Sequence, residues 1–256
     1  MKSVKVVFCF ILFLTFVFCT YSTAEEKKRE DNDYEILYQA SKAYKKGDFE
    51  TAKEKYEKLT LKSNAGGDVF YNLGNCYIRL GNFGKAVLNY ERAKRIMGRN
   101  ADLDFNLQYI RNKLEIAKDN QTFSFFQWLY NFSTAEVLLP FIFINFFFWA
   151  VFALRLWIRA EWSFYLFISI CFLWLVSGIC TGAKWYLMSH DKRVVVTSAE
   201  TFVHAGPSKK DTTIFSLLEG EVVKYENREG DWLLIRMNDE KRGWVDGKDA
   251  ERVLMH

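Results

Sequence analysis

Amide and basic side chains recur in this sequence at a fixed interval of 34 residues. Asn72 and Asn106 form one such pair, and Lys45, Arg79 and Lys113 form a basic series with the same spacing. A carboxamide both donates and accepts hydrogen bonds, so two of them on one surface could hold the backbone of an extended peptide. The alternative is that the three cations are ordinary solvated charges, and the spacing alone leaves both interpretations open.

Residue types that carry out catalysis are scattered. His190 lies near the end of an apolar segment, His204 in an expected strand and His256 at the C-terminus, and none has a neighbouring pattern for metal or nucleophile chemistry. The sequence contains no GxSxG, phosphate-loop or HExxH motif. We therefore expect no enzyme, no metal site and no cofactor.

The cysteines and the charged residues argue against two further features, a structural disulfide and a nucleic-acid partner. Only one of the five cysteines, Cys76, lies outside the apolar segments, so we expect no structural disulfide. The formal net charge is +4, and the basic residues are interleaved with acidic ones, which argues against nucleic acid as a partner. Most acidic residues lie between lysines on expected helix surfaces, where we expect them to be solvated.

The 34-residue interval extends to glycines and to apolar and aromatic residues. The repeated positions are Gly47-Asp48-Phe49 with Ala52 and Tyr56, then Gly81-Asn82-Phe83 with Ala86 and Tyr90. This pattern resembles the tetratricopeptide repeat (TPR), a helical hairpin that must stack on neighbours to bury its apolar face. We expect a TPR region over residues 33–118. It would hold two repeats, residues 34–61 and 67–97, and a closing helix over 101–117. Gly98 replaces the family proline, and Ala43 stands where a tyrosine is usual, so the first repeat matches less well.

The resemblance to TPR proteins implies a concave groove lined by the first helix of each repeat. In that family an asparagine and nearby basic residues grip an extended peptide or its terminal carboxylate. By resemblance, the peptide-binding residues here would be Asn72, Asn106, Lys45, Arg79 and Lys113. Five aromatic residues would form walls of this groove, although some of them must serve packing instead: Tyr38, Tyr44, Tyr71, Phe105 and Tyr109.

Three apolar segments predict membrane association. Residues 1–24 combine two lysines, a short apolar run and a small residue at Ala24, which is typical of a cleaved signal peptide; an uncleaved signal anchor is the alternative. Residues 134–157 and 162–187 are each long enough to cross the bilayer as a helix, and their aromatic residues face every direction, which disfavours a soluble core helix.

Topology follows from the export signal, because the positive charges flanking the two spans are divided between both ends. Export carries the TPR region across the bacterial inner membrane, and an even number of spans returns the C-terminus to the same side. We therefore expect both soluble regions in the periplasm.

The C-terminal residues 194–256 change to short alternating strands separated by Gly, Asp and Asn. A Gly-Pro-Ser turn, the pair Glu219-Gly220, a tryptophan that opens a strand and a final Gly-Trp-Val resemble the bacterial SH3 domain. The resemblance implies an SH3-like β-barrel. Trp232 and Trp244 would lie on its binding surface or in its core, and packing is the favoured interpretation for Trp244.

The order of signal, TPR repeats, membrane hairpin and SH3 domain is similar to the TPR protein of the Bacteroides aerotolerance (Bat) operons. That resemblance implies protein partners, namely membrane-bound von Willebrand factor A domain proteins of the same operon, and a part in oxidative stress tolerance or envelope assembly.

The expected fold class is therefore multidomain, with an all-α TPR array, two transmembrane helices and an all-β SH3-like barrel. The expected function is a membrane-anchored periplasmic adaptor for protein–protein interaction. The alternatives are a tether or sensor that binds peptidoglycan through the SH3 domain, and an accessory subunit of an envelope enzyme or transporter.

Overall fold

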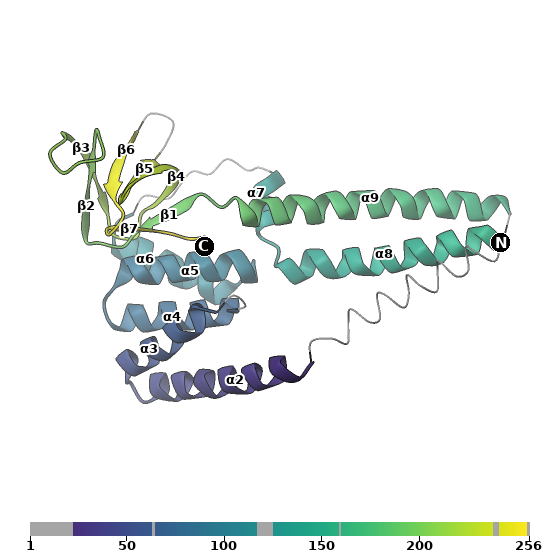
Figure 1. Cartoon of the computed structure of the whole chain (residues 1–256), viewed down its shortest axis with the longest axis horizontal. Coiled ribbons are helices and arrows are strands. Elements are labelled where there is room, and N and C mark those ends of the chain that lie inside the picture. Colours follow the sequence, from purple (N-terminus) through teal and green to yellow (C-terminus); the bar gives the residue numbers. More distant parts are fainter. Residues whose placement is uncertain (1–22, 63–64, 117–124, 159, 238–240, 255–256) are drawn as a thin grey trace. The chain divides into compact units, whose positions relative to one another are not determined.

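The computed structural model describes residues 23–62, 65–116, 125–158, 160–237 and 241–254 (Figure 1). These residues form eight helices and seven strands. The chain divides into two compact units, residues 1–62 and 63–256, and each is described by itself. The expected signal peptide lies outside the described residues except for its last two, Thr23 and Ala24, with which α2 begins.

The first unit contains the helix pair α2 (Thr23–Lys45) and α3 (Phe49–Thr60). Gly47 occupies the left-handed region at φ +83°, which allows the chain to turn sharply between the helices. The Asp48 carboxylate then accepts a hydrogen bond from the Thr51 backbone at 3.1 Å and caps α3. Ala43 is buried, as are four residues of α3.

The second unit begins with α4 (Gly67–Arg79), α5 (Phe83–Met97) and α6 (Ala101–Lys113). Gly81 turns the chain at φ +77°, and Asn82 caps α5 through the Lys85 backbone, which repeats the arrangement of the first pair. Gly74 is essential to the packing, because a Cβ there would lie 2.6 Å from Cε1 of Tyr90. The closing helix ends at Lys113, four residues before its expected end.

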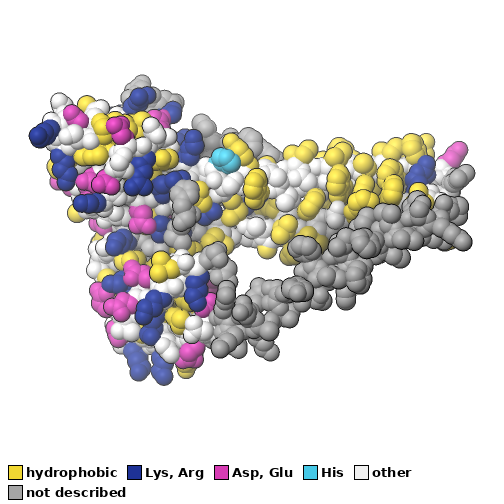
Figure 2. Space-filling model, in the orientation of Figure 1, with side chains coloured by type: hydrophobic (Ala, Val, Ile, Leu, Met, Phe, Trp, Pro, Cys, Tyr) yellow, Lys and Arg dark blue, Asp and Glu magenta, His cyan; other side chains and the backbone are white. Residues whose placement is uncertain are grey.

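Two long apolar helices follow the short helix α7 (Phe125–Tyr130): α8 (Thr134–Trp157) and α9 (Glu161–Ser189). Ser133 and Glu136 form a capping box that fixes the start of α8. Both helices are long and apolar enough to cross a membrane, and their apolar side chains are largely exposed (Figure 2). The stacked rings of Phe148 and Trp174 join them.

The C-terminal residues form one antiparallel sheet in the order β3-β2-β6-β5-β4-β1-β7. Its strands are β1 (Arg193–Val196), β2 (Glu200–His204), β3 (Thr213–Leu218), β4 (Val222–Glu229), β5 (Trp232–Arg236), β6 (Arg242–Asp246) and β7 (Ala250–Arg252). Alternate residues of the strands point inward and build an apolar core that includes Val194, Val203, Leu217, Ile235 and Val245. The expected fold class is confirmed.

Candidate binding surfaces

A polar cluster joins the helices of the second unit at the position of Asn106. Its amide nitrogen lies within hydrogen-bonding distance of three oxygens: 3.1 Å to Tyr90 Oη, 3.2 Å to Asn75 Oδ1 and 3.3 Å to Tyr71 Oη. Tyr90, which is fully buried, donates in turn to Asn75 at 2.5 Å. The Asn106 amide nitrogen is therefore used inside the molecule, where it donates to partly buried hydroxyl and carbonyl oxygens.

Asn72, the other expected amide, is partly exposed on α4. The structure brings Asn106 to Asn75 rather than to Asn72, and among the described residues no hydrogen bond involves the Asn72 side chain. Asn72 thus differs from Asn106, because its amide can serve a ligand without breaking an internal bond.

The three expected cations each lie in the last turn of a helix: Lys45 in α2, Arg79 in α4 and Lys113 in α6. Cations in that position interact favourably with the helix dipole, which gives the 34-residue spacing a structural explanation as well. The Lys113 ammonium also lies 4.5 Å from the ring centroid of Phe83. Lys45 belongs to the first unit, so only Arg79 and Lys113 are described together.

Aromatic side chains give the strongest sign of a binding surface on the repeat helices. Phe105 and Tyr109, four residues apart on α6, are 70% and 47% exposed. Tyr71 instead packs beside Tyr90, with ring centroids 5.7 Å apart. An apolar ring that remains in water is costly, so Phe105 and Tyr109 mark a surface suited to covering by a partner.

On the barrel, Trp232 and Trp244 are both half-buried and lie on the outer face of β5 and β6. His204 pairs with Trp244 across the strands, and its ring meets Trp232 edge-on at 5.5 Å. Phe202, two residues before His204 on β2, is 51% exposed. We name these four residues the aromatic face of the barrel. Each tryptophan therefore packs against neighbouring residues with part of its ring and exposes the remainder to solvent.

Gly243 and Asp246 hold this face in place. A Cβ at Gly243 would lie 2.5 Å from Cγ1 of Val203, so only glycine allows β6 to approach β2 this closely. The Asp246 carboxylate accepts a hydrogen bond from the Lys248 backbone, which lowers its pKa, and Lys209 lies 3.4 Å away. Asp246 therefore stays ionised beside Trp232, its cross-strand neighbour.

Within the described ranges, no three His, Cys, Asp or Glu side chains gather closely enough to hold a metal ion. The three histidines give no such centre there: His190 stacks on Tyr186, His204 belongs to the aromatic face, and His256 lies outside the described residues.

The expectation that acidic residues are solvated is wrong for Glu91. It is 3% exposed and lies beside Arg92, which is 7% exposed, on the outer face of α5. The sequence carries a signal of this burial: Lys53 and Glu54 of the first repeat are replaced by Val87 and Leu88 at the equivalent positions. An outer face that changes from charged to apolar indicates a surface covered by another part of the protein.

Comparison with protein families identifies two modules. Residues 67–100 match the tetratricopeptide repeat model, and residues 199–251 match the bacterial SH3 domain model. Neither a curated protein nor a solved structure gives a significant match. The chain therefore contains a TPR helix pair and a C-terminal sheet that matches a bacterial SH3 domain, modules that typically bind proteins and cell-wall material rather than catalyse reactions.

Proposed function

We propose that this chain is a membrane-anchored adaptor that captures protein segments on its repeat helices and holds them beside the membrane. The observation that carries this proposal is the exposed pair Phe105 and Tyr109 on α6. The same helix is joined to α4 through the hydrogen bond from Asn106 to Asn75. Rings that are exposed in the isolated chain gain most when a partner covers them.

Asn72 would supply the amide contact to the backbone of such a segment, since its side chain is partly exposed. Asn106 would not make the peptide contact that the resemblance to TPR proteins implied. Instead it would hold Asn75 and Tyr90 in place beneath the surface. Arg79, Lys113 and, by its equivalent position, Lys45 would favour acidic segments or a terminal carboxylate.

The apolar hairpin of α8 and α9 supports the membrane anchor, because the exposed apolar side chains of both helices suit lipid rather than water. The export signal expected from the sequence and the two candidate spans support a location of both soluble regions in the periplasm, at the inner membrane. Protease added to intact spheroplasts should then digest the repeats and the barrel, and protection of either until lysis would contradict this topology.

The similarity to the Bat operon TPR protein suggests which partners to seek. They are membrane-bound von Willebrand factor A domain proteins of the same operon, and the physiological role would be aerotolerance or the response to envelope stress. This finer assignment is supported by the order of the modules alone.

The decisive experiment is crosslinked co-purification of the tagged full-length chain from its native membrane, with quantitative mass spectrometry. We expect the double variant Asn72→Ala/Phe105→Ala to bind a specific partner at least about tenfold more weakly, which corresponds to a loss of about 1.4 kcal/mol of binding free energy. The amount of that partner recovered with the variant should fall accordingly. Tyr34→Ala is the matched control, since Tyr34 is an equally exposed aromatic residue on α2. Equal recovery with all three chains would exclude the repeat surface as the binding site.

A second candidate function is a tether to the cell wall, favoured by the aromatic face of the barrel. Rings such as Trp232 and Trp244 can stack on sugars or on peptide stems. The detergent-solubilised full-length chain should then sediment with purified murein, and Trp232→Ala should weaken this binding while Phe105→Ala leaves it intact. A wild-type chain that stays in the supernatant would rule the tether out.

A further inference from the structure

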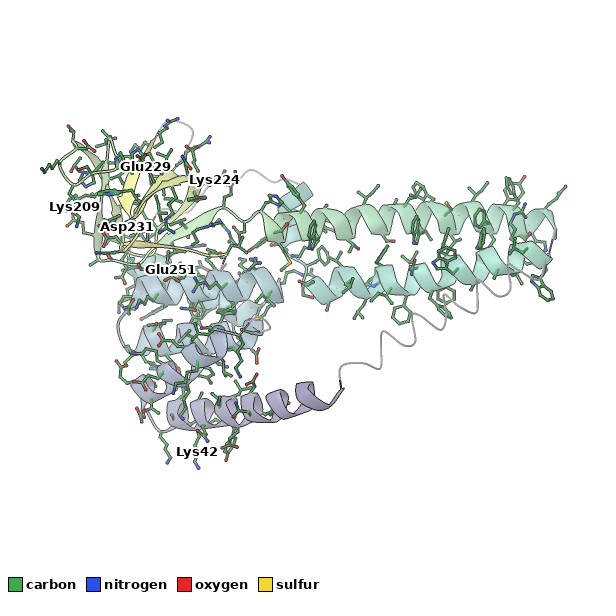
Figure 3. The ribbon with its side chains drawn as sticks, in the orientation of Figure 1. Lys42, Lys209, Lys224, Glu229, Asp231 and Glu251 are labelled. Carbon is green, nitrogen blue, oxygen red and sulfur yellow. The ribbon has the colours of Figure 1, made fainter. Side chains whose placement is uncertain are left out.

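The outer face of α5 is covered by the chain's own C-terminal barrel, and three polar contacts hold the two together. All of these contacts lie within the second unit. They involve residues at the start of α5 and again in its third turn, so they span most of the helix. Figure 3 shows Glu251, one of the barrel residues involved, on the side of the sheet that faces α5.

The first contact is at the N-terminus of α5. The Gly84 backbone N–H donates to the Glu219 carboxylate at 2.6 Å. Backbone N–H groups of the first turn have no partner within the helix, and the helix dipole favours an anion there, so Glu219 caps α5 from the barrel. A Cβ at position 84 would lie 2.7 Å from the Val196 carbonyl oxygen, so glycine is what permits this approach.

The second contact joins Arg92 to the last strand. Its guanidinium donates to the Arg252 carbonyl oxygen at 2.8 Å, to the Val253 carbonyl oxygen at 3.2 Å and to the Glu251 carboxylate at 2.7 Å. The two carbonyl groups lie at the end of β7, where the sheet offers fewer backbone partners. One arginine of the repeat therefore completes hydrogen bonding that the barrel lacks by itself.

The third contact is a charge cluster around Arg193, the first residue of β1. Arg193 donates to Glu91 at 2.5 Å, to Asp191 at 2.7 Å and to the Tyr130 hydroxyl. Burial by itself lowers the pKa of the Arg193 guanidinium, but the carboxylates of Glu91 and Asp191 raise it above its ordinary value. Arg111 lies 3.1 Å from the other Glu91 oxygen. Both charges of the Glu91–Arg193 pair are thus compensated.

Tyr130 extends this cluster to the hairpin. Its buried hydroxyl accepts from Arg193, while its carbonyl oxygen and that of Phe132 accept from the Lys184 ammonium of α9 at 3.2 and 2.8 Å. Burial raises the pKa of Tyr130, so its hydroxyl stays protonated and serves as a neutral acceptor. On the side of the repeat, the Arg99 backbone donates to the Asn131 carbonyl oxygen at 2.8 Å.

We infer that the outer face of α5 is a docking surface whose occupant is this chain's own barrel, so that the second repeat, the barrel and residues 130–132 behave as one rigid body. This inference goes beyond the adaptor function, because it holds whether or not the repeat helices bind a partner. It also assigns the surfaces. The outer face of α5 and the β1–β7 side of the barrel are occupied, whereas Phe105 and Tyr109 of α6 and the aromatic face remain for ligands.

Hydrogen exchange of the full-length chain in detergent micelles tests this inference. Glu91→Gln leaves the side-chain shape nearly unchanged but removes the charge that compensates Arg193. We expect exchange to become at least about tenfold faster in α5 and, in the same variant, in β1 and β7, since parts that open together share one opening equilibrium. Glu57→Gln is the matched control at the equivalent position of the first repeat, and it should leave the barrel unchanged.

A second variant covers the case in which Glu91→Gln fails to fold. Glu219→Gln removes the charge at the other end of the interface, from a side chain that is only partly buried. It should accelerate exchange at the start of α5 as well as in β3 and β4. If α5 opens in either folded variant while the barrel strands keep their wild-type protection, the two are independent modules and the inference fails. No partner is needed for this measurement, so its outcome is separate from that of the adaptor proposal.

Discussion

The helices α3 and α5 occupy the same place in successive repeats and differ in what surrounds them. Their caps correspond, as Asp48 and Asn82, and so do their inward residues, for example Tyr56 and Tyr90. Both helices are described along their full length, and α3 buries four residues where α5 buries nine. The repeat pattern accounts for the inner face of each helix, and the additional buried residues of α5 belong to its outer face.

The comparison shows that residue type alone does not decide burial. Glu57 and Lys58 of α3 correspond to Glu91 and Arg92 of α5, and the charges are the same at both positions. In the first repeat these residues are partly or fully exposed, whereas in the second they are buried and paired with the barrel. The same two charges lie at a partly exposed surface in one helix and in an interface in the other.

The largest change in the free energy of unfolding should come from exchanging residue types between the outer faces of α3 and α5. Leu88→Glu places a carboxylate at a buried position of α5, and we expect it to reduce the free energy of unfolding by more than about 4 kcal/mol. Glu54→Leu, the reverse change at the equivalent exposed position, should stay within about 0.5 kcal/mol. Urea denaturation of the detergent-solubilised chain measures both. Similar losses in the two variants would contradict the difference between the helices.

Removing the acid from each charged pair should give the next largest effect. Glu91→Gln leaves the partly buried Arg193 without one of its two carboxylates, and we expect a loss of about 3 kcal/mol, the lower end of the range for breaking a buried pair. Glu57→Gln should cost less than about 1 kcal/mol, as expected for a pair near solvent. A double-mutant cycle with Arg193→Gln provides the check, because additive losses would mean that Glu91 and Arg193 do not stabilise each other.

Adding one methyl group near the start of α5 should test the close approach of β1. We expect Gly84→Ala to destabilise the chain by about 1 to 3 kcal/mol, since the Cβ would meet the Val196 carbonyl group and Thr197 Cα. Glu50, the equivalent residue of α3, already carries an exposed side chain, so Glu50→Ala is the matched control. Thermal unfolding followed by circular dichroism is sufficient. A stabilised Gly84→Ala chain would mean that helix propensity outweighs the steric contact.

The smallest expected difference is in how the stability of α3 and of α5 depends on pH, because their N-terminal caps are Asp48 and Asn82. Hydrogen bonds from Thr51, through its side chain and its backbone, lower the pKa of Asp48. Because the pKa is lower in the folded state, the stabilisation is complete above the ordinary aspartate pKa of about 3.9 and is lost as the pH falls toward the lowered value. Protection of the α3 backbone from hydrogen exchange should decrease over the same pH range, and Asp48→Asn should abolish this pH dependence. Asn82 does not titrate, so the cap of α5 should show no such dependence.

Much of the fold could be predicted because its signals are local. The 34-residue interval places the turns at Gly47 and Gly81, where a positive φ requires glycine, and uninterrupted apolar residues define α8 and α9. The expected binding residues were harder to assign. Asn106 shares its interval with Asn72, but its amide is used by Asn75, a partner that repeat spacing does not indicate.

By itself, the sequence determined the helix pairs, the two apolar helices, the strand-rich C-terminal module and the turn glycines Gly47 and Gly81. Only the tertiary structure decided which groups compensate the charges of Glu91 and Arg92 on the buried face of α5. The physical reason is that periodicity reports which residues of one helix share a face, whereas the cost of burying a charge depends on partners far along the chain, here Arg193 and the end of β7.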